Sequence, residues 1–404
     1  MDVQVKSRST RRRAEVALAI LLVLILVVVG TAVVWILSTA PIHESAASVP
    51  ATAGIAPSGR YAGAAGQARS QAQALAARDN LPGVSVAVAV DGEIVWTEGV
   101  GWADVERHTP LTPLTRFRLG ALSKPLTAVA AAILHDRGRL DLDAPVQRYV
   151  PAYPKKQWTV TTRELLGDVA GVHRIRGDNN DAMPSSHCED LDEAVELLED
   201  EPLLFEPGTK HRYSIWGWVL VSAVVEGAAG ESFDRFMAHE VFEPLGMTRT
   251  VVSESAGLES AHPFYAPRAM LRPRLGVEEA MRPDYSCLAG GGAFLSTPSD
   301  LVRLGSAMLK PGVLKAETIA AFETPARLPS GATSTYALGW TVSTVQLAGA
   351  PVRMVSHRGS PMGGTATLLT FPDLGLAVSV ASNTSEAKGV QAYALQVAES
   401  FAKR

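Results

Sequence analysis

An uncharged apolar run near the N-terminus constrains this chain more than any other feature. The run covers residues 16–37, and a helix of that length would span ~33 Å at ~1.5 Å per residue, enough to cross the hydrocarbon core of a bilayer. Basic residues precede the run and almost none follow it closely, which predicts that the N-terminus stays in the cytoplasm. These basic residues are Lys6, Arg8, Arg11, Arg12 and Arg13. We therefore predict a cytoplasmic tail over residues 1–15, a membrane anchor over 16–37 and an extracytoplasmic remainder, which in a bacterium would lie in the periplasm.

A cleavable signal peptide that ends near residues 38–40 is the alternative to this anchor. The apolar run is longer than the ~7 to 15 residues usual in a signal peptide, so the sequence favours a helix that stays attached. Residues 38–61 consist largely of Ala, Ser, Pro and Gly and cannot bury much apolar surface, which predicts a flexible linker. One globular domain is then expected over residues 62–404.

Charge and residue spacing exclude several classes of partner. The formal net charge is −4, and the chain has no basic stripe or zinc-finger spacing, so we expect no nucleic-acid partner. His173, His187 and His211 form no metal-binding pattern, and we expect neither a metal nor another cofactor. Cys188 and Cys287 could form a disulfide in an oxidising compartment, but the sequence leaves their pairing open.

Extended segments lie near both ends of the globular part and helical segments lie between them. Asp91-Gly92 separates two runs rich in Val, which predicts a β-hairpin. The predicted strands are 84–90, 93–100, 353–356, 365–371 and 376–382, and a closing helix is predicted over 386–402. This order predicts an antiparallel sheet assembled from both termini with helices packed on it. Residues 256–283 show weak periodicity and many Pro and Arg, which predicts a long surface excursion.

A helix start near residue 120 lies where a reactive group is expected. Pro125 lacks an N–H and suits only the first turn, so the helix begins near Gly120 or Ala121. Residues three apart share a helix face, which places position 121 beside the ammonium of Lys124 and at the positive end of the helix. A serine at position 121 would be an activated nucleophile, but the residue is alanine. Ser123 points ~100° away on the helix and is interpreted as a packing residue.

Residues 117–151, FRLGALSKPLTAVAAAILHDRGRLDLDAPVQRYVP, resemble the S-x-x-K region of serine β-lactamases and penicillin-binding proteins. They are most similar to the class C and esterase branch, which includes mitochondrial serine β-lactamase-like proteins and bacterial relatives. The resemblance implies an α+β, β-lactamase/transpeptidase-like fold. It also implies a serine hydrolase that forms an acyl-enzyme with a peptide, ester or β-lactam-like substrate. Ala121 occupies the nucleophile position, so this chain is expected to be inactive. Further landmarks of the family, among them Tyr336-Ala-Leu-Gly-Trp340, extend over nearly all of residues 80–385.

The same resemblance implies a base and a substrate-binding residue just before a predicted helix. Tyr213 matches the tyrosine of the family's Y-x-N or Y-S-x motif and is a candidate general base, because a nearby cationic lysine favours a phenolate. Ile215 stands where many members carry the asparagine that orients the substrate carbonyl. The alternative is that Tyr213 only packs at the edge of the core.

His357, Gly359 and Ser360 match the K-T-G or H-x-G segment that faces the nucleophile on a strand in the family. The resemblance implies that His357 supplies charge or a proton and that Gly359 lets the substrate backbone lie close. The backbone N–H of Ser360 would join that of residue 121 in an oxyanion hole. One landmark differs: Gly167-Asp-Val-Ala-Gly171 replaces the family's Thr/Ser-His-x-Ser-Gly motif, which puts the substrate preference in doubt.

Two classes of function remain open. The first is a membrane-anchored serine hydrolase whose nucleophile has been replaced, either naturally or by an introduced Ser→Ala change. The second is a non-catalytic binding protein or a scaffold that assembles into homo-oligomers or filaments. Lys124, Tyr213 and His357 are all retained, and buried polar groups without a use would cost stability, which favours an introduced change in a working hydrolase.

Overall fold

A computed structural model of the chain describes residues 2–37, 41–173, 187–252, 263–267, 276–331 and 334–403. The chain divides into two units. One comprises residues 1–42 with 267–278, and the other, globular unit comprises residues 43–266 with 279–404. Most of the predicted surface excursion over residues 256–283 lies outside the described residues.

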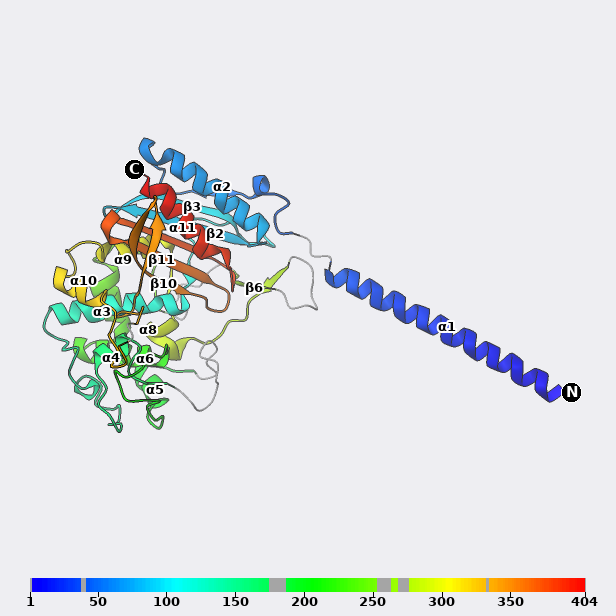
Figure 1. Ribbon diagram of the computed structural model, residues 1–404, viewed down its shortest axis with the longest axis horizontal. Coiled ribbons are helices and arrows are strands. Elements are labelled where there is room, and N and C mark those ends of the chain that lie inside the picture. Colours follow the sequence, from blue (N-terminus) through cyan, green and yellow to red (C-terminus); the bar gives the residue numbers. More distant parts are fainter. Residues whose placement is uncertain are drawn as a thin grey trace. The chain divides into compact units, whose positions relative to one another are not determined.

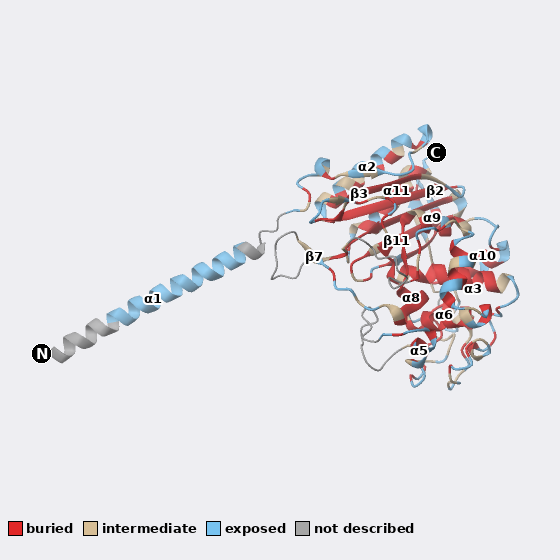
Figure 2. Cartoon of the chain, turned by 180° about the vertical axis from the view of Figure 1, so that it is seen from behind, coloured by how far each residue is buried: buried red, intermediate tan, exposed pale blue. Residues whose placement is uncertain are grey.

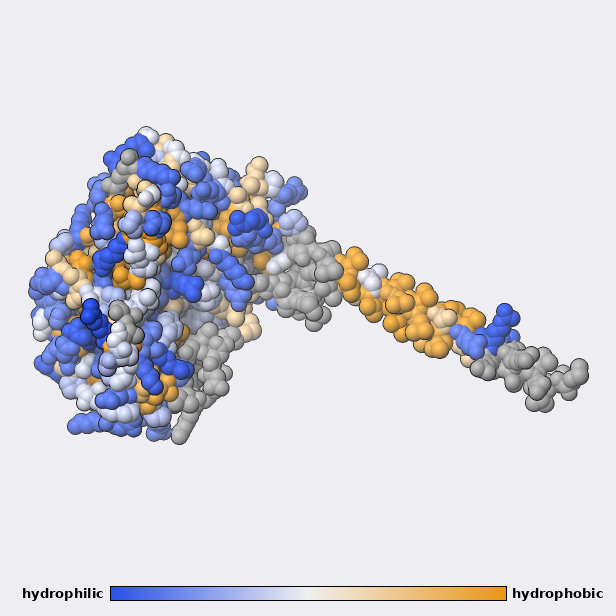
Figure 3. All heavy atoms as spheres, viewed as in Figure 1, coloured by the Kyte–Doolittle hydropathy of each residue, from blue (hydrophilic) through white to orange (hydrophobic). Residues whose placement is uncertain are grey.

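The first unit contains one long helix, α1 (Asp2–Leu37). Residues 12–34 are apolar enough and long enough to cross a membrane, and they form the one such segment found in the part of the chain that the structure describes. Figure 3 shows apolar surface along this helix, and the described side chains of α1 are exposed (Figure 2). A helix that buries none of its apolar side chains in protein suits a lipid environment, although a signal sequence passes the same test of length and composition.

A largely antiparallel sheet forms the centre of the globular unit, with the strand order β1-β3-β2-β12-β11-β10-β9 (Figure 1). Its strands are β1 (Ala51–Ala53), β2 (Gly83–Val90), β3 (Glu93–Asp104), β9 (Thr341–Leu347), β10 (Ala350–Gly359), β11 (Thr365–Phe371) and β12 (Leu376–Ser382). The N-terminal and C-terminal strands meet where β2 pairs with β12, from Leu376 opposite Val90 to Ser382 opposite Val84. The predicted sheet built from both ends of the chain is therefore confirmed.

Helices cover both faces of the sheet. On one face, α2 (Ala62–Arg78) packs against α11 (Gly389–Ala402) and β3 (Figure 1). The buried side of α2 consists mainly of alanines at helical spacing, and these small side chains allow the helix to approach the sheet closely. On the other face, α9 (Pro298–Ala307) packs against β2 and β12.

The helical region that follows the β2–β3 hairpin contains the second and larger part of the core. Helix α3 (Ser123–Asp136) packs on α6 (Trp216–Ala229) and α8 (Ala289–Gly292), and all three are almost completely buried (Figure 2). The other helices are α4 (Thr162–Leu166), α5 (Leu191–Glu196), α7 (Phe233–Phe236), α10 (Ala316–Phe322) and the π-helical turn Met237–Phe242. Short 3-10 turns cover Ala46–Ser48, Gly59–Tyr61, Gly120–Leu122, Val146–Arg148, Ser286–Leu288 and Pro372–Leu374. Short strands are β4 (Thr109–Pro110), β5 (Phe117–Arg118), β6 (Tyr265–Pro267), β7 (Val277–Glu279) and β8 (Leu295–Ser296).

The structure differs from the predicted linker over residues 38–61. Residues 51–53 form the edge strand β1, which pairs with residues 98–100 of β3. Val49 is also buried, and it belongs to the core that α2 and α11 cover. An edge strand needs backbone hydrogen bonds on one side only, so its composition carries little of the alternation that marks a central strand.

Candidate active-site cleft

A tight turn before α3 presents residue 121. The turn runs over Gly120–Leu122, and Gly120 has φ +51°, in the left-handed region that favours glycine. Gly359 on β10 lies against this turn so closely that a Cβ at residue 359 would lie 1.8 Å from the carbonyl oxygen of Leu119. Gly359 was predicted to let a substrate backbone lie close, whereas the backbone that approaches it here belongs to the chain itself. This contact fixes the turn that carries residue 121 relative to β10.

The turn and β10 border a cleft of about 680 Å³. Five predicted site residues line it, namely Ala121, Tyr213, His357, Gly359 and Ser360. They come from three segments that lie far apart in the sequence. Residues 121 and 360 both line the cleft, and the oxyanion hole formed by their N–H groups stays a prediction. Ile215 does not line this cleft but packs against the main core, and its Cγ2 faces Gly291.

Lys124 is fully buried and contacts Tyr213, which lines the cleft. Its Nζ donates a hydrogen bond to the carbonyl oxygen of Ser214 at 3.0 Å. The same atom lies 3.4 Å from Oδ2 of Asp168 and 3.4 Å from the ring centroid of Tyr213. The lysine is therefore positioned by an ion pair, a carbonyl group and an aromatic face, each of which favours the charged ammonium.

Asp168 is held by the residues around it. Its backbone has φ +54°, which is uncommon for a residue other than glycine, and its carbonyl oxygen accepts a hydrogen bond from the backbone N–H of Arg212. Its Oδ1 accepts a hydrogen bond of 3.2 Å from the indole N–H of Trp218. Burial raises the pKa of Asp168 to about 6, and the charge of Lys124 opposes this rise. The carboxylate is therefore largely ionised at pH 7.

His357 is a neutral imidazole in this site. Its Nδ1 lies 2.9 Å from the carbonyl oxygen of Arg358, which can only accept, so the ring proton is on Nδ1. Nε2 is left to accept from the hydroxyl of Tyr336 at 3.3 Å. Burial, reinforced by the positive charge of Lys124, lowers the pKa of His357 to about 3. The resemblance implied that His357 supplies charge or a proton, whereas both of its nitrogens are occupied by the protein.

Residues next to the motifs have structural roles. Ser123 is buried and its Oγ accepts a hydrogen bond from the backbone N–H of Phe294, which agrees with its interpretation as a packing residue. Cys188 and Cys287 form a disulfide that joins the segment before α5 to the segment before α8. Within the described part of the chain, no group of three or more His, Cys, Asp or Glu residues could hold a metal ion.

Sequence reasoning did not find the contacts of Asp168 and Tyr336. Asp168 appeared only as part of a motif that differs from the family pattern, and Tyr336 as part of a general landmark. The aspartate in place of a histidine was the available signal, since a buried carboxylate requires a cationic or hydrogen-bonded partner. Lys124 is that partner in the structure.

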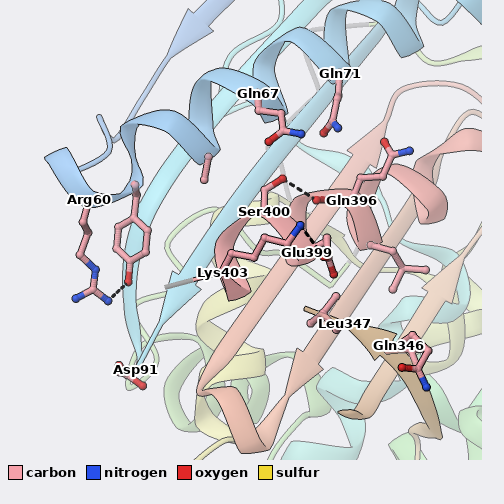
Figure 4. Close-up of a pocket in the computed structure, with 14 residues that line it drawn as sticks. Arg60, Gln67, Gln71, Asp91, Gln346, Leu347, Gln396, Glu399, Ser400 and Lys403 are labelled. Atoms are coloured by element: carbon pink, nitrogen blue, oxygen red, sulfur yellow. Dashed lines mark hydrogen bonds and ion pairs between the residues drawn. The ribbon is translucent and has the colours of Figure 1, made fainter. Parts of the chain in front are cut away.

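A second, larger groove of about 910 Å³ lies between α2, α11 and β9 (Figure 4). Several of its polar groups are already paired: Lys403 with Glu399 at 2.9 Å, and the hydroxyl of Ser400 with the carbonyl oxygen of Gln396 at 3.0 Å. None of the residues predicted from the motifs lines it. The candidate active site is therefore the smaller cleft beside residue 121.

Comparison with known proteins identifies the family and the fold. A sequence model described as "Beta-lactamase" matches residues 68–401. The chain is 29% identical to the mitochondrial serine β-lactamase-like protein LACTB of Mus musculus, over 80% of this chain and 77% of that protein. It is also 29% identical to penicillin-binding protein 4* of Bacillus subtilis (strain 168), over 78% of this chain and 71% of that protein.

Solved structures with this fold include an octameric penicillin-binding protein homologue from Pyrococcus abyssi. Its TM-score is 0.70 at 24% identity, and the match covers 83% of this chain and 77% of that chain. Another is EstCE1, described as a hydrolase with promiscuous acyltransferase activity, with a TM-score of 0.67 at 23% identity. That match covers 83% of this chain and 98% of that chain.

Proposed function

Because the chain belongs to the β-lactamase family, we propose that it is a membrane-anchored member that binds a peptide, ester or β-lactam-like compound in its cleft without hydrolysing it. Proteins with this fold include serine hydrolases and amidases, whose nucleophile is a serine hydroxyl. The cleft that would hold such a compound is present here. The chain would therefore retain recognition and lack the covalent step.

One observation carries this proposal: the side chain at the nucleophile position is the methyl group of Ala121, and it lines the cleft. A methyl group has no lone pair with which to attack a carbonyl carbon. The hydroxyl nearest in sequence belongs to Ser123, which is buried and accepts a hydrogen bond from Phe294. No acyl-enzyme can then form at position 121.

The edge of β10 supports the recognition part of the proposal. Strand β9 pairs with β10 only as far as Ser356, opposite Thr341. Arg358 and Gly359 continue β10 beyond that point and line the cleft. An extended ligand could pair with this edge through backbone hydrogen bonds, while Tyr213 on the opposite segment contacts its side.

Two features support an extracytoplasmic location. The basic residues before α1 and their scarcity after it favour a cytoplasmic N-terminus. The Cys188–Cys287 disulfide suits an oxidising compartment. Self-association into homo-oligomers or filaments stays a prediction, and light scattering on the detergent-solubilised chain tests it.

Equilibrium binding tests the proposed function. The full chain in detergent should bind a penicillin, an aryl ester or an N-acyl dipeptide reversibly in calorimetric titrations, with no acyl adduct by mass spectrometry. Ala121→Leu should abolish binding because the larger side chain projects into the cleft. Ala62→Leu, at an exposed position of α2, is the matched control and should bind normally. Turnover of any of these compounds by the unaltered chain would contradict a non-catalytic function, and binding that persists in Ala121→Leu would contradict the site.

A further inference from the structure

We propose that Asp168 is a positioning residue that keeps Lys124 protonated, so that the absence of hydrolysis is built into two positions of this site, 121 and 168. This inference rests on the proposed function, because it concerns why the cleft binds without reacting. It also predicts that a serine at position 121 is not sufficient to restore the chemistry.

Both partners of this ion pair are buried. The side chain of Lys124 is 0% exposed and that of Asp168 is 1% exposed. An ammonium in such a place, without a counterion, would lose its proton more readily, because burial disfavours the charged form. An ionised carboxylate 3.4 Å away reverses this preference and keeps the proton on the lysine.

A protonated lysine cannot act as a base. An ammonium group has three N–H donors and no lone pair. The surroundings of Nζ use this donor set: the carbonyl oxygen of Ser214, the carboxylate of Asp168 and the ring face of Tyr213. To accept a proton from a serine hydroxyl, Lys124 would first have to be neutral.

Hydrogen bonds hold the carboxylate of Asp168 in place beside Lys124. The backbone N–H of Arg212 holds the carbonyl of Asp168, and the indole of Trp218 on α6 holds the side chain. These contacts come from the segment that also carries Tyr213 and Ser214. The same structural unit that presents the candidate base therefore fixes the counterion of Lys124.

Other titratable groups around Lys124 do not replace this carboxylate. His357 is neutral, and burial together with the charge of Lys124 also lowers the pKa of His211. Burial raises the pKa of Tyr336 well above its usual value, so it too is uncharged at neutral pH. Tyr213 presents its ring face to Nζ. Among these neighbours, Asp168 supplies the negative charge that favours an ammonium.

The test compares two variants, Ala121→Ser and Ala121→Ser/Asp168→Asn, both as the full chain in detergent. The quantity compared is the rate at which the serine at position 121 is covalently labelled. Asparagine keeps the size of the side chain and an oxygen for Trp218 but removes the charge. The reagent is a fluorophosphonate. The serine oxygen attacks phosphorus, the P–F bond breaks, fluoride leaves and the serine proton passes to the neutral amine of Lys124. Mass spectrometry measures the adduct at position 121 from pH 6 to 10.

The double variant should label at least about 10²-fold faster near pH 7.5, because the amine of Lys124 becomes available to accept the serine proton. The pH at which the labelling rate reaches half of its maximum should also be lower in the double variant than in Ala121→Ser. A merely structural role of Asp168 would not shift this pH. Adding Lys124→Met to the double variant should abolish the gain. This control shows that Asp168 acts through the lysine.

Equal rates and an equal pH of half-maximal rate in the two folded proteins, including no labelling of either, would overturn the proposal. If Asp168→Asn does not fold, Asp168→Ser leaves room for a water molecule and provides the same comparison. The labelling rates test this inference independently of the proposed function. The proposed function is tested by ligand binding to the unaltered chain, which has Ala121. A chain that binds nothing would refute that function and still allow the labelling rates to be compared.

Discussion

The hydroxyl of Tyr336 lies 3.3 Å from Nε2 of His357, the ring nitrogen that is left to accept because Nδ1 donates to the carbonyl oxygen of Arg358. The relationship links β10 to the segment before β9. Because burial lowers the pKa of His357, the stability of the folded protein depends on pH.

Replacing His357 by Gln should make the protein less sensitive to acid. The folded state lowers the pKa of His357 to about 3, whereas the unfolded chain has an ordinary value of about 6.5. The unfolded state therefore binds the proton first, and stability is present above pH ~6.5 and is lost as pH falls toward ~3. The loss should reach a few kcal/mol in the free energy of unfolding, measured by urea denaturation at pH 4 and 7.

Asp168 titrates in part of the same range with the opposite sign. Its folded pKa is raised to about 6, so its contribution to stability grows as pH falls from ~6 toward ~4. Asp168 is present in both the parent chain and His357→Gln. The difference between their free energies of unfolding at each pH therefore reports the contribution of His357 alone. If the free energy of unfolding changed with pH in the same way in both proteins, His357 would not be buried as a neutral group.

Gly359→Ala should destabilise the protein by about 3 kcal/mol or more, or prevent folding. A Cβ there would lie 1.8 Å from the carbonyl oxygen of Leu119 and 2.9 Å from the backbone N of Leu122, and neither backbone group can move without displacing residue 121. Gly312→Ala is the control, because nothing lies within 4 Å of its Cβ and its φ is not positive. Equal thermal stability of the two variants would contradict the contact.

Tyr213→Phe should lower the labelling rate of Ala121→Ser/Asp168→Asn by about 10²-fold if the phenol takes part in proton transfer. Phenylalanine keeps the ring face 3.4 Å from Nζ of Lys124, so the position of the lysine should change little. The measurement is again the adduct at position 121, with circular dichroism as a check on folding. An unchanged rate would make Tyr213 a packing residue, the alternative that the sequence left open.

Removing the disulfide should cost about 2 to 5 kcal/mol in the free energy of unfolding. The bridge joins residues 99 apart in the sequence, so it greatly restricts the unfolded chain. Denaturant unfolding of Cys188→Ser/Cys287→Ser should match that of the reduced parent chain. Adding reductant should leave the variant unaffected. An equal stability of oxidised and reduced parent chains would exclude this role.

If the chain is anchored in a membrane as proposed, the full-length chain should sediment with membranes and resist extraction by salt. A protease added from the outer side should digest the globular unit, because the positive residues keep the N-terminus inside. Release of a soluble chain that starts near Pro41 would instead identify the apolar run as a cleaved signal peptide.

The hairpin around Asp91-Gly92 shows what the sequence can predict. Strong alternation and a turn dipeptide are local signals, and β2 and β3 form where these signals place them. The sheet built from both ends followed from the order of the strands. The edge strand Ala51–Ala53 was missed because pairing with β3, rather than its own residue pattern, makes it a strand.

Several members of the candidate site were predictable from the sequence, but their charge states were not. The motifs identified Ala121, Tyr213 and His357, and the structure brings them to one cleft. Burial decides that His357 is neutral, and burial depends on the packing of distant segments. The pairing of Lys124 with Asp168 likewise joins α3 to the segment after α4, which no spacing in the sequence reveals.

The disulfide has a further consequence for the integrity of the cleft. Residues 188–287 form a covalently closed loop that carries Tyr213, while Ala121 and His357 lie outside it. A single backbone nick within the loop would leave two fragments that remain tethered by the bridge. Their reassociation would then be intramolecular, at a high effective concentration, and the nicked protein should keep a complete cleft until the bridge is reduced.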